Sequence, residues 1–267
     1  MPLVLTQLTD EKLAAAVELN NAEWLRLEGT LPWVTFHDDD DVLWIFAGDT
    51  WPRNSVALAR FTPASAHARI GEILAHHLKH KVACNWVVGS VSQPPALGQY
   101  LRAHGFRCMI HCAGMACDLN ELPPTPSAAA GMRIELVDQA PSLQPLTTER
   151  RKRRHEGRNA MARTTPRQVW CFVASQDGKL VGETTLFTGA GVAGIYDVVV
   201  LEKYRRRGMG TALVFAALQR AKQLGYRAAV LAATGMGQGV YGRLGFREVC
   251  KLSFWKYGKM RQLTNDQ

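Results

Sequence analysis

The chain has 267 residues, 47 % of them hydrophobic, and a formal net charge of +9. Its length is long for one small domain and suits two of them. No apolar run approaches the roughly 18 residues that cross a bilayer, and the N-terminal segment lacks the charged start and apolar core of a signal peptide. The six cysteines are scattered without a disulfide framework, so the composition predicts a cytoplasmic protein with no membrane partner.

Charge is distributed unevenly along the chain. Residues 1–130 contain 9 Lys and Arg against 13 Asp and Glu, whereas residues 131–267 contain 23 against 10. The cationic second half suits a polyanionic ligand. Charge alone does not distinguish a small phosphorylated molecule from nucleic acid.

The first half alternates between helical and strand-like patterns. Apolar spacing predicts helices over residues 13–27, 64–81 and 95–104. Short apolar runs predict strands over residues 42–47, 55–61, 84–91 and 108–119. The carboxylate run at 38–41 is interpreted as a solvated loop, because ligands that approach a cation from several directions are absent.

Two clusters contain residue types that bind metals. One consists of His76, His77 and His80 on a predicted helix. The other is formed by Cys108, Cys112 and Cys117 with His111 between them, in a strand-like run. Neither has a second ligand pair with zinc-like spacing, so we predict surface histidines, small buried cysteines and no metal site.

The second half begins after residues 121–131, a Pro-, Ser- and Ala-rich linker. A strand is predicted over 132–137, and a hairpin over 169–175 and 180–187. Between them lies the segment 147–167, in which residues 150–154 are consecutive cations. We favour a solvated, partly mobile helix there. The alternatives are a site for an acidic acceptor, for an anionic partner, or for the phosphates of a ligand.

The most informative stretch spans residues 194–224. A Val-rich strand is followed by a polar loop, by Gly208 and Gly210, and by a helix that ends before Gly225. Glycines let a ligand approach the backbone closely, and a helix N-terminus attracts anions. A Walker lysine and the third glycine of a dinucleotide fingerprint are both missing, so another phosphate-bearing ligand is predicted.

The spacing Arg205-x-x-Gly208-x-Gly210 resembles the pyrophosphate-binding motif of the GNAT superfamily of acyl-CoA-dependent N-acetyltransferases. A second segment, VYGRLGF at residues 240–246, is similar to the family's "LYxKLGF" signature and follows the next strand. Further strand and helix are expected over 227–233 and 237–244, before a last strand. Two signatures in the right order make a chance match a poor explanation.

The first half repeats this order in weaker form. Aligning the Gly-Phe pairs at 105–106 and 245–246 places Ser65 opposite Arg205 and Leu101 opposite Tyr241, so the motif residues are absent from the first copy. That copy resembles the degenerate N-terminal domain of tandem GNAT proteins. The resemblance implies an α/β fold with mixed sheets, divided into a degenerate domain (1–120), a linker (121–131) and a GNAT acetyltransferase domain (132–267).

The resemblance also assigns a coenzyme site. Acetyl-CoA is the implied cosubstrate, and the backbone of Val198, Val199 and Val200 is expected to pair with its pantetheine arm. Thr234 is expected to supply a hydroxyl near the coenzyme. The pyrophosphate is expected against the main chain of Arg205, Arg206, Arg207, Gly208, Met209, Gly210 and Thr211.

Acyl transfer needs a deprotonated amine, a stabilised oxyanion and a protonated thiolate. Tyr241 matches the family tyrosine near the coenzyme's sulfur and is the expected proton donor. For the base, Asp197 in the central strand is the better candidate and Glu183 the second, since a carboxylate within an apolar strand needs a reason. An ordered water is the alternative base.

The predicted function is transfer of an acetyl group from acetyl-CoA to an amine of a small-molecule or peptide acceptor, by direct attack. One rival is an acyl-CoA-binding regulatory protein without turnover. Another is a nucleic-acid or anionic-partner binder that uses residues 147–167, which is disfavoured because aromatic residues are not interleaved with its cations. The sequence leaves monomer and homodimer both open.

Overall fold

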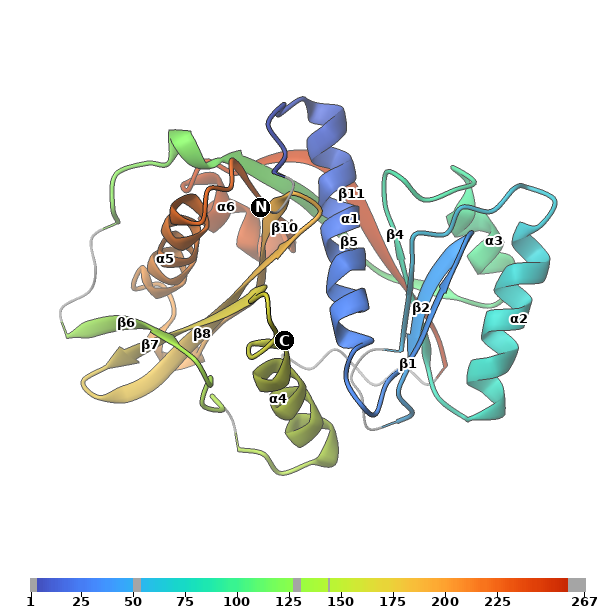
Figure 1. Cartoon of the computed structure of the whole chain (residues 1–267), viewed down its shortest axis with the longest axis horizontal. Coiled ribbons are helices and arrows are strands. Elements are labelled where there is room, and N and C mark those ends of the chain that lie inside the picture. The colour runs from blue at the N-terminus through green and yellow to red at the C-terminus, as the bar shows by residue number, and fades with distance from the viewer. Residues whose placement is uncertain (1–3, 50–53, 127–130, 144, 259–267) are drawn as a thin grey trace.

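The computed structural model describes residues 4–49, 54–126, 131–143 and 145–258 (Figure 1). The first half comprises α1 (Asp10–Glu28), β1 (Thr35–Asp39), β2 (Val42–Phe46), β3 (Ser55–Ala57), α2 (Ala66–Lys79), β4 (Cys84–Val88), α3 (Leu97–Ala103) and β5 (Arg107–Asp118). The second half comprises β6 (Met132–Val137), α4 (Glu149–Met161), β7 (Val169–Gln176), β8 (Lys179–Gly189), β9 (Val192–Val200), α5 (Met209–Gln223), β10 (Ala228–Ala233), α6 (Gly235–Gly242) and β11 (Arg247–Tyr257). The class is mixed α/β, as predicted.

All eleven strands of the described residues join one sheet, in the order β1-β2-β3-β4-β11-β5-β10-β9-β8-β7-β6. The two halves exchange strands at its centre. The last strand, β11, lies between β4 and β5 of the first half, and β5 in turn pairs with β10 of the second half. The sheet therefore runs without a break from one half into the other.

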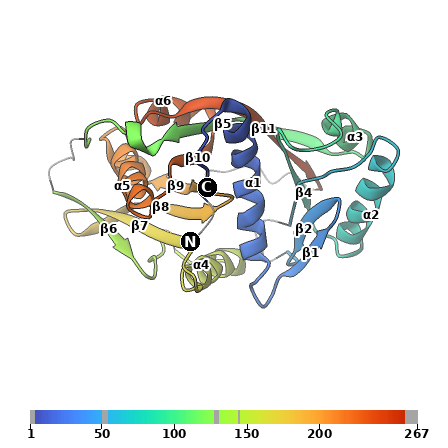
Figure 2. The ribbon, with the colours of Figure 1, turned by 45° about the horizontal axis from the view of Figure 1, so that its top comes forward.

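Helix α1 covers the middle of this sheet, between the two halves (Figures 1 and 2). It starts at the N-cap Thr9, whose side chain accepts from the amide of Lys12. Its Trp24 and Leu25 are both 2 % exposed and belong to a cluster that includes Ile45 of the first half and Phe187 of the second. This shared apolar core joins the halves, since burying one such side chain contributes about 1.5–3 kcal/mol.

Three local predictions need correction. The predicted strand 55–61 ends at Ala57, because Leu58 has a φ of 52° and leaves the extended conformation. The carboxylate run is not a solvated loop throughout. Asp38 and Asp39 are the last two residues of β1, and Asp39 and Asp41 form ion pairs with Arg69 at 2.7 and 3.0 Å.

The histidines of α2 are not all at the surface either. His77 is fully buried, and its ring lies 5.6 Å from that of Trp44, between centroids. No group of three or more His, Cys, Asp or Glu among the described residues is arranged to hold a metal ion. Within the same residues, no helix combines the length and apolar character needed to cross a membrane.

Candidate functional site

The chain kinks within β9, at the residue proposed as a base. Asp197 has a φ of 49°, in the left-handed region that non-glycine residues rarely adopt. The register with β8 shifts at the same place, because Glu183 pairs with Val199 whereas Thr185 pairs with Tyr196. This is a β-bulge, and it changes the direction in which the backbone groups of the following residues point.

Beyond the bulge, β9 separates from its other neighbour. Strand β10 pairs with β9 at Ala193 and Gly194 and then continues against β5 as far as Ala233. Along Val198–Val200, β8 occupies one side of β9, and the described ladders place no strand on the other. The three valines predicted to hold a pantetheine arm therefore lie at an open internal edge, where an extended amide-containing ligand can pair.

The open edge leads into the arginine loop. Arg205 donates from its Nε to the Val200 carbonyl at 3.0 Å, which holds the loop against the end of β9. Arg206 and Gly208 have φ values of 59° and 79°, and α5 begins at Met209. Within the described part of the chain, no hydrogen bond is found for the amides of Arg206, Arg207 and Gly208. Successive unpaired amides beside a helix N-terminus form an anion-binding concavity.

The two motif glycines have different reasons to be glycine. Gly208 needs its positive φ to turn the chain into α5. Gly210 does not, because a Cβ built there would meet only a methyl of Val200 at 3.9 Å, an ordinary contact. The fold tolerates a side chain at Gly210, so its absence keeps space open beside the first turn of α5. Of the neighbouring residues, Met209 is buried and Thr211 half-buried.

Tyr241 and Thr234 lie at the two ends of α6, which follows β10. Thr234 is the N-cap of α6, but its side chain makes no capping hydrogen bond. The Tyr241 ring packs edge-on against Phe246, with centroids 6.0 Å apart, and burial raises the pKa of its hydroxyl. A Cβ at Gly237 would lie 2.7 Å from that ring, which accounts for one of the extra glycines in this segment. The raised pKa extends the pH range over which the phenol stays protonated.

Both candidate bases form ion pairs with the basic segment. Arg154 contacts Asp197 at 2.6 Å, and Arg158 contacts Glu183 at 2.8 Å. The side chains of Asp197 and Glu183 are 16 % and 13 % exposed. Since Arg154 and Arg158 are one helical turn apart on α4, one face of this helix is fixed against β8 and β9. Segment 147–167 is therefore not simply a solvated helix, and neither pair is evident from the sequence.

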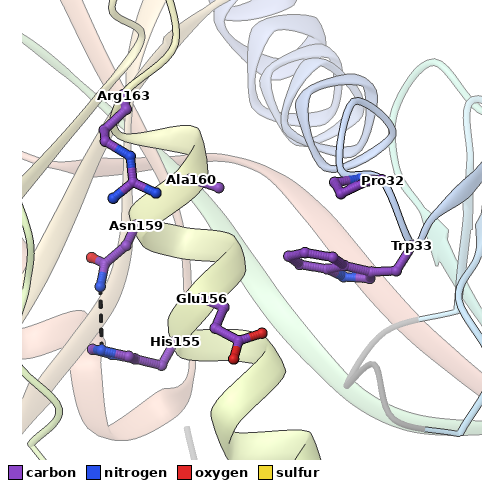
Figure 3. Close-up of a pocket in the computed structure, with 7 residues that line it drawn as sticks. All are labelled: Pro32, Trp33, His155, Glu156, Asn159, Ala160 and Arg163. Carbon is purple, nitrogen blue, oxygen red and sulfur yellow. Dashed lines mark hydrogen bonds between the residues drawn. The ribbon is translucent and has the colours of Figure 1, made fainter.

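The next face of α4 lines a cavity of about 470 Å³ (Figure 3). Pro32 and Trp33, from the segment that follows α1, form the opposite wall. Burial, together with the charge of Arg158, lowers the pKa of His155. The lining residues from α4 and its C-terminal extension are His155, Glu156, Asn159, Ala160 and Arg163.

The fold and this site define a mixed α/β protein in which a splayed strand pair opens onto a helix N-terminus, preceded by amides that make no hydrogen bond within the described residues. Residues 134–246 match the model of the acetyltransferase (GNAT) family. Residues 134–246 therefore form a GNAT acetyltransferase domain within the second half, which supports acyl-transfer activity. A comparison with curated proteins gave no match.

Solved structures of the same fold cover nearly the whole chain. A GCN5-related N-acetyltransferase from Kribbella flavida has a TM-score of 0.65 at 18 % identity and covers 92 % of this chain and 98 % of its own. A tandem GNAT protein from the clavulanic acid biosynthesis pathway has a TM-score of 0.61 at 18 % identity, with 93 % and 94 % covered. A GCN5-related N-acetyltransferase from Sphaerobacter thermophilus has 0.58 at 16 %, with 93 % of each chain covered. The tandem GNAT architecture thus extends over both halves.

Proposed function

We propose that the protein transfers an acetyl group from acetyl-CoA to an amine. The observation that carries this proposal is a pair of neighbouring backbone sites among the described residues. Along Val198–Val200, β9 has no strand on one side, and in the arginine loop the amides of Arg206, Arg207 and Gly208 make no hydrogen bond. Pantetheine is an extended diamide and the coenzyme carries a pyrophosphate, so the ligand supplies the missing partners in the same order.

The residues around this row fit the steps of acyl transfer. Tyr241 protonates the departing thiolate, since its hydroxyl is kept neutral by burial. Asp197 is engaged by Arg154, and an ion-paired carboxylate is a weak proton acceptor. We therefore assign Asp197 the task of fixing the bulge, and water accepts the amine proton. Thr234 offers its hydroxyl to the coenzyme.

The rival functions are supported less well. A nucleic-acid surface on 147–167 would need its arginines free, whereas Arg154 and Arg158 are held by Asp197 and Glu183. A coenzyme-binding regulator without turnover shares the whole coenzyme site and is separated from an enzyme by catalysis alone. We also propose a cytoplasmic location, which the six free cysteines support.

The test is thermal unfolding of the full chain with acetyl-CoA, with acetate and ATP as controls. At a hundred times its dissociation constant, acetyl-CoA should add about 2.7 kcal/mol to the free energy of unfolding, and acetate should add nothing. Gly210→Val should abolish the shift without lowering the melting temperature of the ligand-free protein, because the fold leaves room for the side chain.

A matched control is Ala68→Val, an exposed position in the first turn of α2 in the first half. This variant should keep the full acetyl-CoA shift. The proposal is wrong if wild type shows no shift with acetyl-CoA, or if Gly210→Val responds as the wild type does.

A further inference from the structure

Strand β6 forms one end of the sheet, on the side away from α1 and the first half (Figures 1 and 2). It pairs with β7 along its whole length without a register shift, from Met132 opposite Gln176 to Val137 opposite Cys171. Among the described residues, no strand pairs with its other side. Such an edge presents backbone groups to which a strand of another chain can hydrogen-bond.

The hydrogen bond at the start of this ladder shows which backbone groups of β6 face the open edge. The amide of Asp177 donates to the Gly131 carbonyl at 3.3 Å. In an antiparallel ladder, residues that bond to the neighbouring strand alternate with residues whose amide and carbonyl point away from it. The odd-numbered residues of β6 therefore bond to β7. The amides and carbonyls of Met132, Ile134 and Leu136 point to the open edge.

The side chains of β6 lie on two faces, because successive residues of a strand point to opposite sides. Met132 and Ile134 pack against the apolar cluster that includes the buried residues of α5. Leu136 is on the same face and is 43 % exposed. Arg133 and Glu135 lie on the other face, where both are exposed and form no ion pair within the described residues. The edge thus carries an exposed apolar side chain and two opposite charges.

These side chains are complementary to those of a second β6 strand. A two-fold axis perpendicular to the sheet makes the two strands antiparallel, and the outward backbone groups meet when the axis passes through a residue. An axis at Arg133 would place two arginines opposite each other, and an axis at Glu135 would place two carboxylates opposite each other. An axis at Ile134 places Arg133 opposite Glu135 twice and Leu136 opposite Met132 twice. Only this last register matches both opposite charges and apolar side chains.

We infer that the chain forms a symmetric homodimer through β6, in the register centred on Ile134. Ile134 and its counterpart exchange both of their backbone hydrogen bonds, as do Met132 and Leu136 of the second copy. The charged pairs occupy the positions between them, where facing side chains lie closest. One short strand on each side is a smaller interface than the roughly 1,200 Å² of a stable complex, so the association is weak and depends on concentration.

The opposite edge of the sheet does not offer the same match. Strand β1 contains Asp38 and Asp39 but no Lys or Arg, so no self-pairing register places a carboxylate opposite either cation. Both carboxylates are also paired within the chain, Asp38 with Arg26 at 2.8 Å and Asp39 with Arg69 at 2.7 Å. Contact through β6 alone closes at two copies, whereas contact between β6 and β1 would produce open chains of copies.

Analytical ultracentrifugation of the full chain over a series of concentrations tests the inference. The mass should rise from that of one chain to that of two and stop there. Glu135→Arg places arginines opposite each other in both charged pairs and should weaken the association at least about tenfold. Arg133→Glu places carboxylates there and should have a similar effect. The double variant Arg133→Glu/Glu135→Arg restores opposite charges in the same register and should recover the wild-type affinity.

Two further variants separate this pairing from general effects of charge and stability. Glu248→Arg makes the same charge change at an exposed position of β11 and should leave the association unchanged. Leu136→Pro removes an outward amide at an edge position that tolerates proline, so it should weaken the dimer more than Leu136→Ala does. A protein that stays monomeric up to about 1 mM would overturn the inference. So would a mass that grows beyond two chains, or a double variant that associates no better than the single ones.

Discussion

Both halves of this protein have the same type of fold, in which the chain bends away from a neighbouring strand and leaves a gap in the sheet. The gap stays open in the second half and is filled in the first half. In the second half, β9 bends at Asp197 (φ 49°) and its end has no strand on one side among the described residues. In the first half, the chain bends similarly after β3, at Leu58 (φ 52°). There Gln93 fills the gap by donating its amide to the Ala59 carbonyl at 2.7 Å and accepting from the Phe61 amide at 3.2 Å.

The loops that lead into α2 and α5 differ in the same way, in whether their backbone amides have hydrogen-bond partners. In the first half, Thr62 and Ser65 satisfy each other's amides with their side-chain oxygens, both at 3.1 Å. In the second half, the corresponding loop keeps the amides of Arg206–Gly208 without such partners among the described residues. The comparison indicates that backbone amides and carbonyls stay available to a ligand where no nearby segment of the chain hydrogen-bonds to them. Where such a segment does so, the ligand site is lost.

The largest effect that separates the halves is expected at Tyr241, which aligns with the buried Leu101 in the first half. Tyr241→Phe should lower turnover by about 100-fold, because the thiolate then leaves without a proton donor. Affinity for acetyl-CoA should change little, since the ring still packs on Phe246. The measurement is release of free CoA from acetyl-CoA over a panel of amines, beside calorimetry with acetyl-CoA. Unaltered turnover would show that Tyr241 is not the acid.

An intermediate effect is expected at the bulge. Asp197→Ala loses the ion pair with Arg154 and places a residue less tolerant of positive φ at the kink, so the free energy of unfolding should fall by about 2 kcal/mol. Asp197→Asn also loses the charge but tolerates the left-handed region, so it should recover about half of this loss. Urea unfolding measures both. Equal losses would mean that the backbone at Asp197 is not strained.

The smallest effect concerns acid sensitivity in the first half. Burial lowers the pKa values of His37, His76 and His77, and His76, His80 and His37 oppose one another's charge. The unfolded chain therefore takes up protons near pH 6.5 that the folded chain does not, and stability falls as the pH drops below this value. For the buried His77, each unit of lowered pKa is worth about 1.4 kcal/mol at low pH, and His37 and His76 contribute less because solvent screens them.

Chemical unfolding at pH 7 and pH 5 measures this loss. His77→Leu should make the difference smaller, whereas His111→Gln, at an exposed position of β5, should leave it unchanged. If the difference between the two pH values is the same in His77→Leu as in wild type, the buried histidine does not contribute to it.

Most of the secondary structure and the main segments of the proposed coenzyme site could be predicted from the sequence, because both depend on local patterns of residues. The valine run, the loop and the two glycines stand within 13 residues of one another, from Val198 to Gly210. The sequence assigned Gly208 and Gly210 alike to close approach of a ligand, whereas the structure shows that Gly208 also takes a φ of 79° where the chain turns into α5. The binding roles of these residues stay predictions.

What the sequence did not show depends on distant partners. Arg154 and Asp197 are 43 residues apart, and nothing in the spacing of either indicates the other. The basic segment was therefore interpreted as solvated, although Arg158 is 9 % exposed and pairs with Glu183. The hydrogen bonds of Gln93 in the gap of the first half could not be predicted from the sequence either. They are made by backbone groups and do not depend on the type of side chain. The proposed division at 121–131 does not describe the exchange of β5 and β11 across the sheet.

That exchange has a consequence for how the protein is made. Strand β11 occupies residues 247–257 near the end of the chain, yet its place in the sheet is between β4 and β5 of the first half. During synthesis, the facing edges of β4 and β5 lack their native partner until β11, which follows the other described strands in the chain, has left the ribosome. Such edges readily pair with the wrong strand. The sheet of the first half is therefore completed only when β11 has been made.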